Sequence, residues 1–266
     1  MQAKPSVIHP DLEHPSSVSE LLKGQHLTDE SSLTSQVFAL LKELIVTIKL
    51  YPGQLISEKE VADTLNASKT PVREAMIRLQ GIGLVTIVPK SGTYVTAIQI
   101  TRYIEACFTR LHLEVGAVRR AAANQSSWES ILKMENILQQ QAAALESGQD
   151  LEFFKLDEAL HQAFFDAAGV SGVWNTVKDS QADVYRIRHL KRMHNIRRER
   201  QIIEDHKAIV AAIRNGSPDD AEAAMINHIG SLEQEVETLA SHTDLLNFIE
   251  VLNSANQKNR QARRAE

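Results

Sequence analysis

Apolar residues at helical spacing mark the first regular element of the chain. They occupy positions 37, 40, 41, 44, 45 and 48, and the Pro-Gly pair at 52–53 ends the pattern. Two shorter helices are predicted over about 57–65 and 70–81, joined by a tight turn at 66–68. Ser57 is placed to cap the first of them, and Pro71 stands at the start of the second, where its missing N–H is harmless.

The pattern then changes to alternation. Residues 84–88 and 93–97 alternate between apolar and polar side chains around a turn at 89–92, which predicts a β-hairpin. Beyond residue 100 only helical periodicity remains, and we expect helices over 101–123, 127–147, 150–168, 171–194, 199–214 and 218–241. The predicted fold class is mostly α: an N-terminal winged helix-turn-helix followed by an all-α antiparallel helical bundle.

The two ends of the chain lack such patterns. Residues 1–33 hold three prolines and several serines without periodicity, so we predict a flexible N-terminal arm. Residues 243–266 are predicted to form a C-terminal tail, in which the charged stretch from Gln257 to Glu266 frays. Between them we place one domain at 34–98 and a second at 99–242.

Composition narrows the class of protein. The chain has 266 residues, of which 43% are hydrophobic, and a net charge of −5, which is typical of a globular protein with two domains. The single cysteine, Cys107, excludes an internal disulfide framework. Since the sequence has no apolar run of membrane-spanning or signal-peptide length, we expect no membrane contact and a cytoplasmic location.

The domain at 34–98 has the element order of a DNA-binding module. In a helix-turn-helix the second helix enters the major groove and the first holds its angle. Arg73 on that second helix has the forked donors that read guanine. Ser68 and Thr70 can donate to phosphates, Lys59 lies at the start of the preceding helix, and Lys69 opens the second helix. Lys90 and Gly92 at the hairpin tip complete the set of candidate DNA-binding residues. On charge alone, an ordinary solvated helix face remains the alternative.

The run PGQLISEKEVADTLNASKTPVREAMIRLQGIGLVTIVPKSGTYVT at 52–96 closely resembles the DNA-binding domain of the GntR family of bacterial transcription regulators. The resemblance implies that the residues named above face a double-stranded DNA operator. One position departs from the family, which usually has arginine where Lys69 stands. Lysine keeps the charge for a phosphate contact but lacks the forked geometry for reading a base.

Four metal-ligating side chains fall on apolar stripes of the second domain. Asp157 and His161 are four residues apart and share a helix face. His206 and His228 both lie about 14–15 Å from the turn that joins their helices, so an antiparallel hairpin holds them side by side. One carboxylate and three imidazoles suit a divalent metal, with Zn²⁺ favoured over Ni²⁺ or Mn²⁺. The alternative is buried histidines that bond backbone carbonyls.

Helices 101–241 resemble the FCD domain, the effector domain of FadR-type GntR regulators, and the same four residues match its metal-binding pattern. The expected count of six helices places the chain near the VanR-type branch. Arg110 matches an arginine that often faces the effector cavity in this family, which implies that it clamps a small carboxylate effector. The alternative for Arg110 is a surface position beside Glu114.

These expectations combine into a metabolite-responsive bacterial transcription factor, a repressor that a small organic acid relieves. One short recognition helix reads too few base pairs for genomic specificity, so a homodimer on a near-palindromic operator is predicted. Two alternatives stay open. One is a metal-dependent hydrolase that uses the Asp/His₃ site to activate water. The other is a scaffold in which the metal only joins helices.

Overall fold

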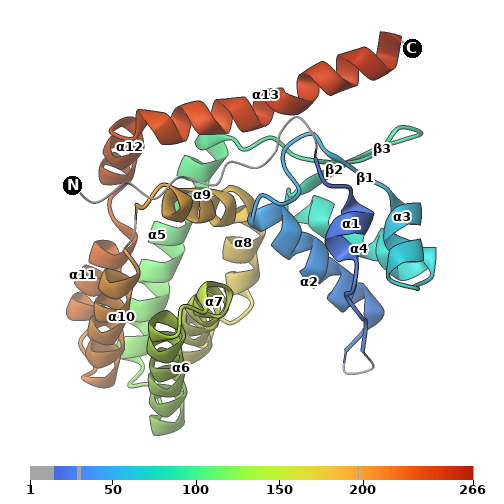
Figure 1. Cartoon of the computed structure of the whole chain (residues 1–266). Coiled ribbons are helices and arrows are strands. Elements are labelled where there is room, and N and C mark those ends of the chain that lie inside the picture. The colour runs from blue at the N-terminus through green and yellow to red at the C-terminus, as the bar shows by residue number, and fades with distance from the viewer. Residues whose placement is uncertain (1–14, 29–30, 197, 266) are drawn as a thin grey trace. The chain divides into compact units, whose positions relative to one another are not determined.

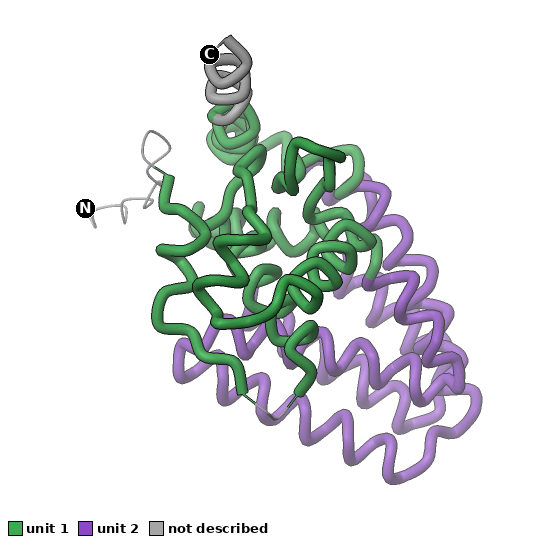
Figure 2. Tube along the Cα trace, turned by 90° about the vertical axis from the view of Figure 1, so that its right-hand side faces the viewer, with its two compact units in different colours: residues 1–103, 179–196, 239–266 green, residues 104–178, 197–238 purple. Residues whose placement is uncertain are grey.

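The computed structural model describes residues 15–28, 31–196 and 198–265, with side chains up to residue 255. The chain forms two compact units, shown in green and purple in Figure 2. Unit 1 comprises residues 1–103, 179–196 and 239–266, and unit 2 comprises 104–178 and 197–238. The mostly helical fold class expected from the sequence is confirmed. The domain boundaries at 98 and 242 stay a prediction, since both units are discontinuous in sequence.

Unit 1 begins with a helix where the sequence predicted an arm. Ser17 and Glu20 form a reciprocal capping box at the start of α1 (Val18–Leu22). Val18 and Leu22 are each 1% exposed and join the core of this unit. The arm prediction is therefore wrong for this stretch, because two apolar residues four apart suffice when a core is already present to receive them. Residues 1–14 and 29–30 of the predicted arm lie outside the described residues.

The three helices expected next are all present. They are α2 (Leu33–Val46), α3 (Glu58–Thr64) and α4 (Lys69–Gly81). The Ser57 hydroxyl caps α3 by accepting from the Glu60 N–H, as the sequence predicted. The apolar face of each helix contributes to one core: Val37, Leu41, Leu44, Ile45, Val61, Ala62, Val72, Ala75, Met76 and Leu79.

A small antiparallel sheet completes the module. Its strands are β1 (Leu55–Ile56), β2 (Val85–Val88) and β3 (Gly92–Val95), in the order β1-β3-β2. The predicted hairpin is confirmed, with Val88 paired to Gly92. The two-residue strand β1 was not predicted because it is too short to show alternation. Gly92 has a φ of 138°, a backbone conformation that residues with a Cβ rarely adopt, so this position favours glycine for the fold itself.

Two later helices also belong to unit 1. Ala182 of α9 (Ala182–Met193) is part of the core described above. The Asn253 side chain of α13 (Thr243–Ala265) bonds both the N–H and the carbonyl of Ile98. The predicted tail at 243–266 is therefore a helix packed on this unit, with residues up to Leu252 on its apolar face buried. The fraying expected from Gln257 onwards stays a prediction.

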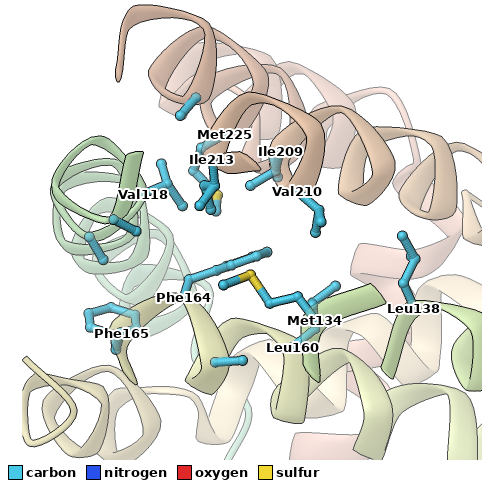
Figure 3. Close-up of a cluster of buried hydrophobic side chains, with 14 of the residues drawn as sticks. Val118, Met134, Leu138, Leu160, Phe164, Phe165, Ile209, Val210, Ile213 and Met225 are labelled. Carbon is cyan, nitrogen blue, oxygen red and sulfur yellow. The ribbon is translucent and has the colours of Figure 1, made fainter. Parts of the chain in front are cut away.

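Unit 2 is made of helices. They are α5 (Ile100–Ala123), which enters it at Ile104, α6 (Trp128–Glu146), α7 (Asp150–Ala167), α8 (Val173–Ser180), α10 (Glu199–Arg214), α11 (Pro218–Ile229) and α12 (Leu232–Ala240). Figure 1 shows α10 and α11 running side by side, and α6 beside α7. Aliphatic and aromatic residues of these helices form a second core, which includes the fully buried Phe164 and Met134 (Figure 3).

Two of the six expected helical spans are each divided in two. The span 171–194 is α8 and α9, separated at Gln181, and the span 218–241 is α11 and α12, separated at Gly230 and Ser231. The described chain therefore has eight helices between Ile100 and Ala240, and the six-helix count behind the VanR-type branch is corrected. The first break has neither a proline nor a glycine, and the second has a glycine but no proline. Because the apolar periodicity also continues through both breaks, the sequence predicted one helix for each span.

Candidate metal centre and DNA-binding surface

The four predicted metal ligands lie together inside unit 2. Asp157 and His161 come from α7, His206 from α10 and His228 from α11, and all four are buried. One ligand atom from each residue lies within 4.8 Å of the others. The Nε2 atoms of His161 and His228 are 3.2 Å apart, and His206 Nε2 is 3.6 Å from Asp157 Oδ1. The convergence expected from spacing alone is therefore present.

Local sequence explains this convergence. A three-residue turn, Asn215–Ser217, joins α10 to α11, and Gly216 supplies its left-handed conformation with a φ of 66°. The turn makes the two helices antiparallel neighbours, which brings His206 and His228 to the same height. Asp157 and His161 occupy successive turns of one face of α7, where leucine would otherwise be expected.

Each of the three imidazoles has an oxygen beside its other ring nitrogen. Glu114 Oε2 is hydrogen-bonded to His161 Nδ1, and Gln141 Oε1 lies 2.9 Å from His206 Nδ1. Asp205 Oδ2 lies 3.6 Å from His228 Nδ1. At His161 and His206 these hydrogen-bonded oxygens favour a proton on Nδ1 and direct the Nε2 lone pairs into the cluster, which is the arrangement that metal-ligating histidines adopt. The 3.6 Å separation at His228 is an ion-pair distance rather than a hydrogen bond.

The sequence analysis missed this outer set. Gln141 is 0% exposed on α6 and also approaches Asp157 Oδ1 with its Nε2 at 3.5 Å, so it contacts two of the four candidate ligands. A polar residue on the apolar face of its helix is the signal that could have found it. Asp205 directly precedes His206 in the chain, but its carboxylate lies beside His228. Spacing within one helix does not reveal this partner.

Electrostatics keep the site in a form that can bind a cation. Burial lowers the pKa of His228 to about 4, although Asp205 opposes this, so His228 is neutral near pH 7 and its nitrogen lone pair is available. Burial alone would raise the pKa of Glu114. The Arg110 guanidinium and the His161 ring outweigh it and hold that pKa well below its usual range, so Glu114 is an anion that accepts from both.

The residues fit a first-row divalent metal ion. Three imidazole nitrogens and one carboxylate oxygen are borderline ligands of the kind that Zn²⁺, Ni²⁺ and Mn²⁺ accept. In a tetrahedral zinc site, ligand atoms are about 3.3–3.5 Å apart. Three separations in this cluster, 3.2, 3.6 and 4.0 Å, lie around that spacing, and all four ligand atoms are within 4.8 Å of one another.

Arg110 lies beside this cluster rather than on the surface. Its side chain on α5 is 5% exposed, and its Nε donates to Glu114 Oε1 at 2.7 Å. Its Nη2 is 3.5 Å from His161 Nε2, a candidate ligand atom. The alternative of a surface arginine beside Glu114 is therefore wrong, although the pairing with Glu114 is present.

The predicted DNA-binding residues gather around the start of α4 and the hairpin tip of unit 1. Ser68 is the N-cap of α4, and its hydroxyl makes no capping bond, which leaves it available for another acceptor or donor. Lys90 adopts a left-handed backbone at the hairpin tip, with a φ of 60°. Among the predicted set, all are exposed except the half-buried Gly92: Lys59, Ser68, Lys69, Thr70, Arg73 and Lys90.

Arg73 is already engaged by a carboxylate. Its Nε and Nη2 donate to the two oxygens of Glu58 on α3, at 3.2 and 3.0 Å, and its side chain is 64% exposed. An exposed pair of this kind is only weakly stabilising because water screens it, so it orients the guanidinium without preventing an exchange for guanine. Sequence spacing gave no sign of this partner, because Glu58 is fifteen residues away on another helix.

Comparison with known proteins gives one family pattern for the DNA-binding region and another for the region that holds the candidate metal-ligating cluster. The pattern described as "Bacterial regulatory proteins, gntR family" matches residues 33–95, and the FCD domain pattern matches 105–231. The chain is 32% identical over 210 residues to the HTH-type transcriptional repressor RspR of Escherichia coli K12, which covers 79% of this chain and 91% of that protein. The chain belongs to the gntR family of bacterial regulatory proteins.

Solved structures show the same fold for this GntR-family chain. E. coli McbR/YncC matches 80% of the chain and 99% of its own length at 20% identity, with a TM-score of 0.65. A GntR regulator described as putative, from Rhodococcus sp. RHA1, matches 82% and 99% at 16% identity, with a TM-score of 0.62. Among the described residues, no helix has both the length and the apolarity needed to cross a lipid bilayer.

Proposed function

We propose that this GntR-family regulator is a repressor that releases its operator when a small carboxylate binds at a metal in unit 2. The observation that carries the proposal is the convergence of Asp157, His161, His206 and His228 in a chain that also has a GntR DNA-binding module. Its relative RspR is described as a transcriptional repressor, which supports the sign of the regulation. A cytoplasmic location follows from the need to reach DNA.

On the DNA side, α4 would enter the major groove with its first turn towards the bases. Arg73 would give its fork to a guanine, and Lys69, Ser68 and Thr70 would contact phosphates and neighbouring base edges. Lys59 at the start of α3 would hold the backbone, and Lys90 with Gly92 would bring the hairpin tip to the adjacent groove. A homodimer presenting two such helices would require a near-palindromic operator.

On the sensor side, the four ligands would hold the metal, with zinc favoured by three nitrogens and one oxygen, and nickel or manganese as alternatives. A bound metal supplies a positive Lewis-acidic centre for an anionic oxygen. The protein's own contribution is Arg110, whose Nη2 lies beside His161 and could take a second oxygen of the same carboxylate. This pairing of metal and guanidinium supports a carboxylate as effector.

Regulation would follow from linkage. An effector changes DNA affinity only as far as it binds more tightly to one arrangement of the units than to another. The metal would have an architectural part in this, because its ligands come from three helices of unit 2. A hydrolase using the same residues gains no support from relatives such as RspR, which are described as regulators of transcription.

The DNA-reading half is tested by Arg73→Ala. We expect this change to weaken specific operator binding by about 1–3 kcal/mol, because a base contact is lost, while the metal content stays unchanged, because no residue of the cluster is altered. Fluorescence anisotropy with an operator fragment at fixed salt measures it. Arg214→Ala is the matched control, since Arg214 is an exposed arginine of unit 2 that also pairs with a glutamate, Glu135. Equal affinities for both variants and the wild type would refute the role of Arg73.

A further inference from the structure

The buried carboxylate of Glu114 touches both a candidate metal ligand and the candidate effector residue. Its side chain, on α5, is 1% exposed. Oε2 is hydrogen-bonded to His161 Nδ1, and Oε1 accepts from Arg110 Nε at 2.7 Å. Nothing in the proposed function uses Glu114, since it is not among the four converging ligand residues.

The first contact decides which nitrogen of His161 can bind a metal. Glu114 already accepts from the Arg110 guanidinium through Oε1 and is placed to accept through Oε2 as well, so the ring nitrogen that faces it carries the proton. His161 Nε2 then has its lone pair directed towards His228 Nε2 and Asp157 Oδ1, 3.2 and 4.0 Å away. Without the carboxylate, either tautomer of His161 becomes available, and one of the two cannot ligate from this position.

The second contact decides how a buried positive charge behaves next to a metal. Arg110 Nη2 is 3.5 Å from His161 Nε2, so an uncompensated guanidinium there would repel a divalent cation. Glu114 supplies the opposite charge on the Nε side of the guanidinium. Because only Nε is bonded to Glu114, the Nη2 side stays directed towards the centre.

Resting on the metal site of the proposed function, we propose that Glu114 is a positioning residue that fixes His161 for metal binding and neutralises Arg110 beside it. The other two residues that lie beside the Nδ1 atoms differ from Glu114. Gln141, beside His206, is an uncharged amide, and Asp205 contacts His228. The metal affinity thus depends on the Glu114 carboxylate, which also orients Arg110, the candidate effector-binding residue.

Zinc titration of the full-length chain by calorimetry tests this assignment. Glu114→Gln keeps the shape and removes the charge, and we expect the zinc dissociation constant to rise about 10–100-fold. Glu105→Gln is the matched control, because it removes the same charge from an exposed position of α5, and its zinc affinity should stay within about twofold of the wild type. Circular dichroism checks that each variant is folded.

A second pair of variants removes the guanidinium from the comparison. Arg110→Met and the double variant Arg110→Met/Glu114→Gln both lack the guanidinium, so they differ only in the carboxylate beside His161. We expect the double variant to bind zinc at least tenfold more weakly than Arg110→Met, and its cobalt-loaded form to show shifted d–d absorption bands. Glu114→Asp should recover part of the affinity lost in Glu114→Gln.

Equal zinc affinity for Arg110→Met and the double variant would overturn the positioning role of Glu114, as would a Glu114→Gln variant that binds zinc as the wild type does. In both cases the metal site of the proposed function would survive. A wild-type chain that binds no zinc, nickel or manganese would instead remove the proposed metal site, and this inference with it.

Discussion

At the scale of single residues, the site depends on which nitrogen each imidazole presents. The three histidines show Nε2 to one another and to Asp157, while Glu114, Gln141 and Asp205 face the Nδ1 atoms. Burial without such partners would be unfavourable for every one of these polar groups. The geometry is therefore held by pairs of residues rather than by four ligands alone.

His206→Ala removes one ligand from this set. We expect the variant to lose bound metal, because three ligands and a cavity in place of the ring hold a divalent ion far less tightly. Elemental analysis after gel filtration measures the metal retained per chain. His112→Ala is the control, since His112 is exposed on α5 and hydrogen-bonds only the Phe108 carbonyl in the described structure. Full metal retention by His206→Ala would refute the four-ligand site.

Sequence spacing was enough to predict the four converging candidate ligands but not the residues behind them. Asp157 and His161 share a helix face, and His206 and His228 flank one turn, so the 1.5 Å helical rise sets their positions. Gln141 and Glu114 come from helices whose rotation relative to α7 and α10 is set by packing. No local pattern encodes that rotation, and the same holds for the pairing of Arg73 with Glu58.

At the scale of elements, the sequence predicted whether a segment is helix or strand better than it predicted where helices end or break. The hairpin and the capped start of α3 follow from local chemistry and were predicted correctly. The breaks at Gln181 and Gly230 were missed, because apolar periodicity continues across them. The helices α1 and α13 were also missed, since their stability comes from burying a few apolar side chains against unit 1 rather than from a long periodic pattern.

The attachment of α9 within unit 1 depends on a fully buried arginine. Arg186 donates to the Thr96 carbonyl at 2.7 Å, the Ala97 carbonyl at 3.2 Å and the Asp183 carboxylate. Burial lowers the pKa of Arg186, and Asp183 opposes that effect. The arginine therefore joins α9 to the segment that directly follows strand β3.

Arg186→Met should destabilise the chain by about 3–5 kcal/mol, because it leaves the buried Asp183 carboxylate and two carbonyls without this donor. Equilibrium unfolding in urea, followed by far-UV circular dichroism, measures the loss. Arg214→Met removes an exposed arginine from a surface pair and should cost at most about 1 kcal/mol. If the two variants lost equal stability, the structural role of Arg186 would be wrong.

At the scale of the whole molecule, sequence families and compact units divide the chain differently. The FCD pattern covers residues 105–231, yet the segment 179–196, which contains α9, is part of the unit that contains the GntR module. The chain consequently passes between the two units four times. Each passage is a covalent route by which a change at the candidate metal centre could bias the DNA-reading unit, provided that the two arrangements differ in free energy.

The central claim is that Asp157, His161, His206 and His228 hold a metal in this regulator. Anomalous diffraction at the zinc absorption edge, from crystals grown with one equivalent of zinc per chain, tests it most directly. The account predicts one strong peak per chain, about 2.0–2.2 Å from the three histidine Nε2 atoms and the Asp157 carboxylate. A zinc peak held by other residues, with none among these four, would contradict it.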